Sequence, residues 1–173
     1  MVPFMRTPSR ISLAMVVAAT LAAACSSGSS RGPPSGSSLV PVTKVTDGDT
    51  IHVTYLGVDE RVRLIGIDSP EVPWYGGKGE CFGVEAGLYA RSRLTTKSVR
   101  LAFDQARRDR YGRLLAYVYL GGELFNLTQV RLGYATSDPV PPDTAMAPKF
   151  AAAEREARAA GRGLWRACPA AGS

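Results

Sequence analysis

The sequence is poor in the residues from which zinc sites are usually built, because it contains one histidine and three cysteines among 173 residues. A zinc site of the usual composition is therefore not expected, and we interpret the single histidine, His52, as a strand-surface residue. The sequence also has no internal repeat, so it gives no sign of a repeat architecture. Its apolar stretch at residues 11–24 is too short to span a bilayer comfortably.

The composition is that of an ordinary globular protein. Apolar residues make up 45% and charged residues 21% of the chain, which argues against a disordered or fibrous protein. The length suits a single domain with a hydrophobic core. The net charge is +6, and without the first 24 residues there remain 19 basic against 15 acidic residues. This excess favours a polyanionic partner, although charge alone is weak support.

The N-terminus has the pattern of a targeting segment, in which two arginines precede the apolar stretch and Cys25 follows it. Residues 21–25 resemble a bacterial lipoprotein cleavage box, in which the cysteine becomes the lipidated first residue. The alternative is an ordinary secretory signal, and in both cases we expect the domain to be exported. We divide the chain into a signal peptide (1–24), a Ser/Gly/Pro-rich tether (25–38), a globular domain (39–168) and a short tail (169–173).

The remaining two cysteines form an even pair if Cys25 carries lipid. In an oxidising compartment, Cys81 and Cys168 are then expected to form a disulfide, the alternative being two unrelated buried thiols. Because neither residue lies in a catalytic motif, reduction is expected to lower thermal stability and to leave activity at low temperature mostly unchanged.

Short β-rich runs separated by turn signals begin at residue 39. We predict strands at 40–45, 50–56, 60–67, 99–103 and 114–120. A helix is predicted at 84–97, with Leu88 and Leu94 among the candidates for its inner face. Asn126 and Gln129, three places apart, indicate a short capped helix, and a last helix with Pro148 in its first turn is predicted to run to Gly161. This order predicts an α+β fold, a five-stranded OB-type barrel with about three helices.

Two acidic motifs fall at the ends of predicted strands. The first, residues 47–50, reads Asp-Gly-Asp-Thr, which alone is typical of a hairpin turn. The second has Arg63 inside an apolar strand, followed by Asp68 and Glu71 around a proline. Asp49, Asp68 and Glu71 would repel one another unless a positive charge lay between them. Oxygen ligands of this kind favour Ca²⁺ or Mg²⁺.

A third motif, residues 107–113, is rich in arginine and is followed by an apolar strand. The simple interpretation is a solvated hairpin tip, but Arg113 adjoins the strand and can be held on the barrel surface. Two fixed arginines, a cation and carboxylates are the elements of a phosphodiesterase site. Arg63 and Arg113 can each bind phosphate oxygens with two donors, which leaves Glu71 to act on water.

In this order and spacing, the three motifs resemble the thermonuclease or staphylococcal nuclease family. The resemblance runs from about residue 40 to residue 165. It implies that Asp49, Asp68 and the backbone carbonyl of Ser69 bind Ca²⁺. It also implies that Glu71 orients or deprotonates the attacking water, and that Arg63 and Arg113 bind the scissile phosphate.

The resemblance further implies an OB-type barrel, DNA and RNA as substrates, and products that end in 3′-phosphate. Tyr111 would bind a terminal phosphate together with Arg110, which stands where the best-known member has lysine. The family's pair of tyrosines falls in residues 137–142, which contain no aromatic residue. Loss of base stacking there is worth about 1 to 3 kcal/mol of binding per base. Tyr134 is a candidate substitute for this pair.

Two rival functions remain open on the sequence alone. A domain of this fold can lose catalysis and only bind nucleic acid, and a structural surface lipoprotein can use its basic patch on anionic envelope polymers. The first rival typically lacks the carboxylates or the arginines, whereas this chain has all of them. We therefore predict an exported, monomeric, calcium-dependent nuclease that is anchored to a membrane through Cys25 or secreted.

Overall fold

The structure is a computed structural model that describes residues 38–168 and Met1. The predicted signal peptide, the tether, the lipidation site Cys25 and the tail at 169–173 lie outside the described residues, apart from Met1 and Ser38. They stay predictions from the sequence. Within residues 38–168, no helix is both long enough and apolar enough to cross a membrane.

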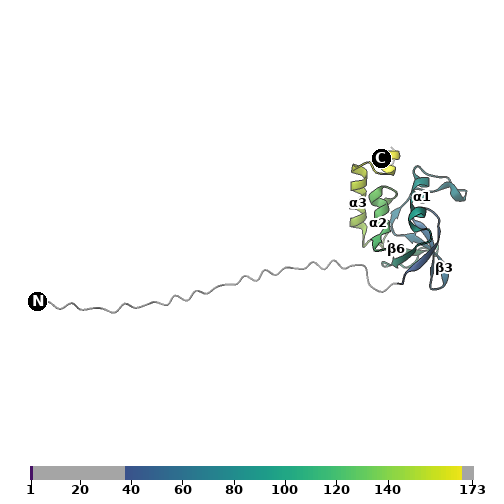
Figure 1. Cartoon of the computed structure of the whole chain (residues 1–173). Helices are drawn as coiled ribbons and strands as arrows, with labels where there is room; N and C mark the ends of the chain where they lie inside the picture. Colours follow the sequence, from purple (N-terminus) through teal and green to yellow (C-terminus); the bar gives the residue numbers. More distant parts are fainter. Residues whose placement is uncertain (2–37, 169–173) are drawn as a thin grey trace. The chain divides into compact units, whose positions relative to one another are not determined.

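Five strands close into a barrel, which confirms the predicted OB-type architecture and the α+β class (Figure 1). Around the barrel the order is β3-β2-β1-β5-β6, and all neighbours in this order are antiparallel. Parallel pairing of β3 with β6, with Val62 opposite Leu114, closes the barrel. The strands are β1 (Val40–Val45), β2 (Thr50–Tyr55), β3 (Val58–Leu64), β5 (Ser98–Ala102) and β6 (Leu114–Leu120).

Alternating burial explains why these segments form strands around one core. In β2, Ile51 and Val53 are fully buried, and a strand places such alternate side chains on one face of the sheet. In β1 the buried residues Val42 and Val45 are three apart, because the pairing with β2 shifts between Val42 and Lys44. The extra residue of a β-bulge re-aims the side chains that follow it.

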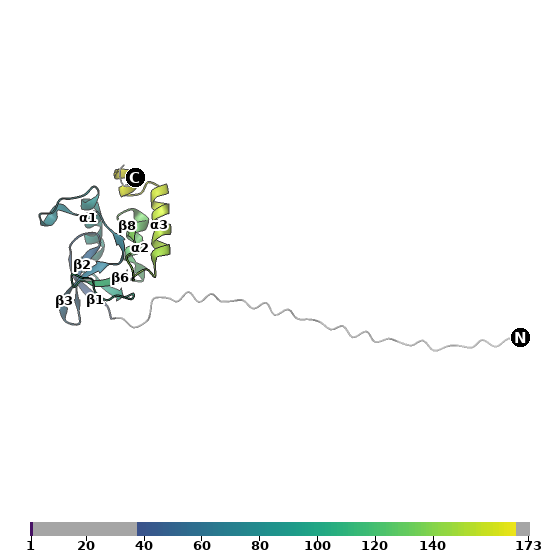
Figure 2. The same ribbon diagram turned by 180° about the vertical axis from the view of Figure 1, so that it is seen from behind.

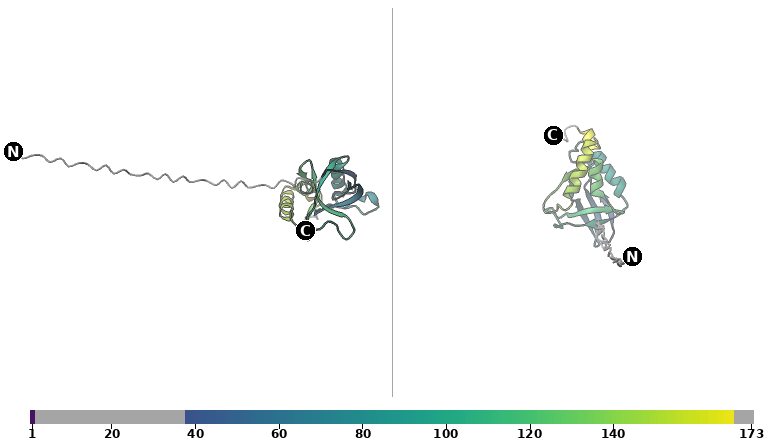
Figure 3. Two further views of the ribbon diagram at one scale, coloured as in Figure 1. Left: turned by 90° about the horizontal axis from the view of Figure 1, so that it is seen from below. Right: turned by 90° about the vertical axis from the view of Figure 1, so that its left-hand side faces the viewer.

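The helices lie together on one side of the barrel (Figures 2 and 3). Helix α1 packs small residues against the strands, with Ala86, Ala90 and Leu94 fully buried at intervals of four. The prediction for Leu94 is confirmed, whereas that for Leu88 is wrong, because its side chain is 53% exposed. Besides short 3-10 helix η1 (Pro73–Tyr75), the helices are α1 (Gly83–Leu94), α2 (Phe125–Leu132), α3 (Ala147–Ala159) and α4 (Leu164–Ala167).

The third predicted strand is in fact two strands. β3 ends at Leu64 and β4 (Gly66–Asp68) leaves the barrel to pair with β8 (Thr136–Asp138). The break occurs at Gly66, whose φ of +80° is strained for residues with a Cβ. A Cβ at this position would also collide with the ring of Phe150 from α3. The turn carries Asp68 out of the barrel wall while Arg63 stays within it.

The predicted capping role of Asn126 and Gln129 is wrong. The N-cap residue of α2 is Leu124, at the end of the two-residue strand β7 (Glu123–Leu124), and it makes no side-chain cap bond. Both amides are instead fully buried and bond to the strands and the turn that α2 covers. Asn126 accepts the Val118 N–H at 2.9 Å and donates to the Ile65 carbonyl at 3.0 Å.

We predict that Gly66→Ala destabilises the fold more than Gly57→Ala does. Both glycines have a φ of +80°, which costs alanine about 1 to 2 kcal/mol. Gly57 has open space around it, whereas the new methyl group at Gly66 would have to displace Phe150. Such overpacking adds about 1 to 3 kcal/mol. Urea unfolding of both variants measures the difference, and equal losses of stability would show that the contact with Phe150 is unimportant.

Candidate active site

The turn between β1 and β2 directs Asp49 inward. Asp47 accepts the backbone N–H groups of Asp49 at 2.9 Å and Thr50 at 2.6 Å, as expected for the aspartate of a tight turn. A Cβ at Gly48 would collide with the side chain of Ser69, so only glycine lets the turn approach β4 this closely. The turn interpretation of this motif therefore holds for Asp47, whereas Asp49 is buried, with 6% of its surface exposed.

Each carboxylate oxygen of Asp49 has a partner. Oδ2 accepts the Ser69 N–H at 2.8 Å and lies 2.8 Å from Nη1 of Arg63. Oδ1 accepts the hydroxyl of Thr50 at 3.0 Å. A buried carboxylate needs such partners, because an uncompensated charge is very costly in the protein interior. The first two motifs are thus brought into direct contact.

Arg63 lies between the two aspartates. Its Nη2 is 2.8 Å from Oδ1 of Asp68, and its Nη1 also donates to the Ile67 carbonyl at 2.8 Å. The guanidinium therefore supplies positive charge between Asp49 and Asp68, where the sequence predicts a cation. It is 16% exposed, so it is held in place by its partners rather than free in solvent.

One guanidinium does not neutralise the acidic groups around it. Burial raises the pKa of Asp49 from 3.8 to about 6, although Arg63 acts in the opposite direction. Burial and then the charge of Asp49 raise the pKa of Asp68. The pKa of Glu71, which is exposed after Pro70, is raised by burial and by the charges of Asp49 and Glu80. The site thus has surplus negative charge, which a bound cation would relieve.

The third motif forms a second, basic part of the site. Oδ2 of Asp109 accepts a 2.6 Å hydrogen bond from Nε of Arg113. Oδ1 of Asp109 accepts the backbone N–H groups of Tyr111 and Arg113, each at 2.9 Å. Arg113 is thereby held at the start of β6, as predicted, and its two terminal nitrogens are left for other acceptors. The sequence prediction did not include this role of Asp109, although its spacing of four residues from Arg113 could have indicated it.

A cavity of about 530 Å³ brings the two parts together. Its wall includes four residues predicted to contact substrate, namely Arg63, Arg110, Tyr111 and Arg113. Tyr111 is 62% exposed, and its hydroxyl accepts a 2.6 Å hydrogen bond from Arg110. Asp49, Asp68 and Glu71 are not in the wall, and the two aspartates are joined to it through Arg63.

The cavity is also lined by residues of the segment 138–143. Val140, Pro141 and Pro142 give this part of the wall an aliphatic surface, which is flanked by Asp138 and Asp143. These residues belong to the segment in which the sequence analysis found no aromatic pair. Tyr134 does not replace that pair, because its ring stacks on Tyr89 at 4.2 Å and on Phe82 at 5.6 Å, away from the cavity wall. In the described residues, base contact at this wall would be made by aliphatic side chains.

Comparison with known proteins agrees with these features. A sequence model described as "Staphylococcal nuclease homologue" matches residues 61–167. The chain belongs to the staphylococcal nuclease family. The matched range contains Arg63, Asp68, Glu71 and Arg113 but begins after Asp49. Asp49 is joined to residues of this range by its contacts with Arg63 and with the N–H of Ser69.

Relatives in the staphylococcal nuclease family align with most of the domain. The thermonuclease of Staphylococcus intermedius is 39% identical over 124 residues, covering 72% of this chain and 74% of that protein. The thermonuclease of Staphylococcus hyicus is 36% identical over 124 residues, covering 72% of this chain and 73% of that protein. Endonuclease YncB of Bacillus subtilis is 34% identical over 128 residues, covering 73% of this chain and 61% of that protein.

We predict that the stability of Asp49→Asn relative to the parent protein increases with pH. Between pH 4 and 6 the unfolded parent has lost the Asp49 proton, whereas the folded parent, with its pKa raised to about 6, still binds it. The parent therefore loses stability as the pH rises, by roughly 3 kcal/mol at most, and the asparagine variant has no such loss.

Urea unfolding of both proteins at pH 4, 5, 6 and 7 in excess chelator measures this difference. Asp59→Asn is the matched control, because bonds from His52 and Thr43 lower the pKa of Asp59 and reverse the sign. Because a lowered pKa places the titration of Asp59 below its ordinary value of 3.8, the stability of that variant relative to the parent should change little between pH 5 and pH 7. A difference between Asp49→Asn and the parent that does not change with pH would contradict the prediction.

Proposed function

We propose that the chain is an exported, calcium-dependent nuclease that hydrolyses phosphodiester bonds of DNA or RNA and leaves 3′-phosphate ends. The observation that carries this proposal is the placement of Arg63 and Arg113 in one cavity wall, with carboxylates bonded to Arg63. Two arginines can neutralise a phosphodiester, and acidic groups beside them can hold a cation and act on water. The names of the relatives, two thermonucleases and an endonuclease, support the same activity.

The donor set fits Ca²⁺. Asp49, Asp68 and the carbonyl of Ser69 would hold it, with water completing the coordination. Within residues 38–168, no three acidic, histidine or cysteine side chains converge in a way that could hold a metal. The proposed ion would therefore have few protein ligands in an irregular arrangement, which Ca²⁺ tolerates better than Mg²⁺ does. When bound, Ca²⁺ would polarise the phosphate and offset its negative charge.

The protein residues have separate tasks in this mechanism. Arg63 and Arg113 bind the non-bridging phosphate oxygens and stabilise the charge that develops on them. Arg110 and Tyr111 bind a terminal phosphate at the same wall. Glu71 takes a proton from a water whose oxygen attacks phosphorus. The bond to the 5′ oxygen breaks, and that oxygen accepts a proton, so a 3′-phosphate and a 5′-hydroxyl result.

Export and membrane anchoring rest on the sequence of residues 1–25, and a secreted form is the alternative. The structure contains the expected disulfide between Cys81 and Cys168, which supports an oxidising compartment. A catalytically weak surface lipoprotein that only binds nucleic acid is the second candidate function. The aliphatic residues of the cavity wall favour this second candidate, because without base stacking they would hold substrate less tightly.

Glu71→Gln is expected to lower kcat by roughly 10² to 10⁴, the range for loss of a general base. Binding of DNA should change little, because the substitution leaves both arginines in place. Cleavage of labelled single-stranded DNA gives the rate, and binding of the same strand gives the affinity. Glu85→Gln, which changes an exposed residue of α1, is the control and should behave as the parent protein does. If Glu71→Gln retains the parental rate, Glu71 does not act on water.

Removal of Ca²⁺ with excess chelator is expected to abolish cleavage of DNA reversibly. Added Ca²⁺ should restore the rate, and Mg²⁺ should restore it poorly, because Mg²⁺ requires near-octahedral geometry. The assay uses labelled single- and double-stranded DNA, with unfolding monitored in parallel to show that the chelated protein stays folded. Full activity in chelator would remove the metal from the mechanism.

A further inference from the structure

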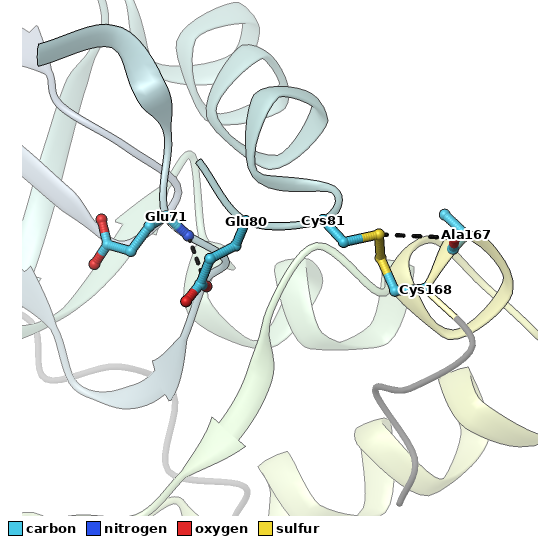
Figure 4. Close-up of a disulfide and its surroundings, with 5 residues drawn as sticks. All are labelled: Glu71, Glu80, Cys81, Ala167 and Cys168. Carbon is cyan, nitrogen blue, oxygen red and sulfur yellow. Dashed lines mark hydrogen bonds between the residues drawn. A yellow bond between two sulfur atoms is a disulfide. The ribbon is translucent and has the colours of Figure 1, made fainter. Parts of the chain in front are cut away.

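The backbone of Glu71 is held from both sides by one other residue, Glu80. The N–H of Glu71 donates to Oε2 of Glu80 at 3.0 Å, and the N–H of Glu80 donates to the carbonyl of Glu71 at 2.9 Å. Figure 4 shows the first of these bonds, with the side chain of Glu80 turned toward the nitrogen of Glu71 and the carboxylate of Glu71 pointing away. The two bonds close the loop of residues 72–79 at its base.

The rest of the loop is anchored at its middle. It contains three glycines and is mostly exposed, with Val72 as its one buried side chain. Trp74 and Tyr75 contact α1, because the guanidinium of Arg91 lies 3.4 Å from the centre of the Trp74 ring and donates to the Tyr75 hydroxyl at 3.3 Å. These contacts lie three and four residues after Glu71, so the two bonds from Glu80 are the ones that act on the Glu71 backbone directly.

The turn that carries Glu80, residues 80–83, lies directly against the backbone of Glu71. The N–H of Gly83 donates to the carbonyl of Glu80 at 3.0 Å. A Cβ at Gly83 would overlap the carbonyl oxygen of Glu71, so the turn and the Glu71 peptide are in close contact. A shift of residues 80–83 would consequently be transmitted to the backbone of Glu71.

The disulfide fixes this turn to the C-terminal part of the domain. Cys81, the residue after Glu80, is bonded to Cys168, which follows α4 and is 8% exposed (Figure 4). α4 is in turn bound to the end of α2, because the N–H of Leu164 donates to the carbonyl of Gly133 at 2.9 Å. The end of α2 is therefore connected to the turn next to Glu71, first by a hydrogen bond to α4 and then by the disulfide.

We propose that Glu80 is a positioning residue for Glu71 and that the Cys81–Cys168 disulfide holds Glu80 in place. The inference rests on the proposed role of Glu71 in activating water. Glu80 touches neither substrate nor water in this role, and its two hydrogen bonds act on the Glu71 backbone. Its charge also acts on the Glu71 carboxyl, so the variant Glu80→Gln, which removes the charge and keeps the acceptor, separates the two effects. The proposal revises the expectation from the sequence that reduction leaves activity at low temperature mostly unchanged, because that expectation did not include the bonds between Glu80 and Glu71.

The expected signature is a loss of rate without a loss of substrate binding. A misplacement of about 1 Å in a reacting group can cost about 10² in rate. Arg63 and Arg113 lie on β3 and next to β6 and are held by their own bonds to Asp49, Asp68 and Asp109, so the contacts that bind phosphate should persist. The effect is therefore expected in kcat, with KM nearly unchanged.

The test compares steady-state cleavage of single-stranded DNA in Ca²⁺ by variants of the full chain. Glu80→Ala should lower kcat by roughly 10- to 100-fold and change KM by less than about twofold. Glu80→Gln keeps an oxygen acceptor for the Glu71 N–H and should stay within about threefold of the parental kcat. Glu85→Ala removes an exposed carboxylate of α1 and is the matched control.

A double-mutant cycle tests whether Glu80 acts through Glu71. In the Glu71→Gln background, Glu80→Ala should lower kcat by less than about threefold, because the side chain that it positions is already inactive. Parental kcat in Glu80→Ala, or equal losses in the two backgrounds, would overturn the proposal. Parental kcat in Glu71→Gln would instead refute the role of Glu71 in activating water, on which the inference rests, so the two failures can be told apart.

The disulfide is tested with the paired substitution Cys81→Ser and Cys168→Ser, assayed well below its unfolding temperature. We expect kcat to fall roughly 3- to 10-fold with KM unchanged, and Glu80→Ala to cost less in this background than in the parent. If the paired variant does not fold, the folded oxidised protein is reduced and assayed directly. Parental kcat in the folded, disulfide-free protein would show that the disulfide does not hold Glu80.

Discussion

The burial of the Asp49 carboxylate is the constraint on which the rest of the site depends. A carboxylate that is 6% exposed needs partners of the right kind at the right distance, and three different segments supply them. Arg63 comes from β3 and faces Thr50 across the β2–β3 pair, so the strand register itself delivers the guanidinium to the site. The backbone N–H of Ser69 reaches the Asp49 carboxylate because the chain turns out of the barrel after Leu64. Even so, the pKa of Asp49 stays raised at about 6, which means that the ionised site opposes folding until positive charge is added.

Helices α2 and α3 support this arrangement through contacts with the turns that carry its residues. Gln129 donates to the carbonyl of Gly48 at 2.7 Å and so fixes the turn that carries Asp49. Asn126 bonds to Ile65, one residue before the break at Gly66, and Phe150 from α3 lies against that glycine. The buried amide of Asn126 is satisfied at both its oxygen and its nitrogen, and this adds geometric specificity because a shifted helix would leave the amide unpaired in the interior. The site is therefore held both by side-chain bonds from α2 and by the pairing of the strands that carry its residues.

The sequence predicted what depends on local pattern and missed what depends on tertiary contact. Strand β6 was predicted with its observed bounds, because residues 114–120 form an uninterrupted apolar run. Leu88 was misjudged because α1 approaches the barrel closely with small residues, Ala86 and Ala90, which carry little hydrophobic signal. The acidic residues and arginines of the site were found from their motifs, but the position of Arg63 between Asp49 and Asp68 was not. Glu80 had no sequence signal at all, since an exposed glutamate beside a glycine-rich loop is ordinary.

The two tasks of the proposed mechanism are carried by parts of the chain with different rigidity. Arg63 and Arg113 are attached to paired strands of a closed barrel, so substrate contacts depend on the core. Glu71 is attached to an exposed loop, whose geometry depends on two hydrogen bonds and, one residue further, on a disulfide. Core packing and disulfides respond to different conditions, because reduction of a disulfide leaves apolar burial intact. It follows that reducing conditions should act on the rate of the chemical step before they act on the fold or on substrate affinity, and this links turnover to the oxidising compartment in which we propose that the chain works.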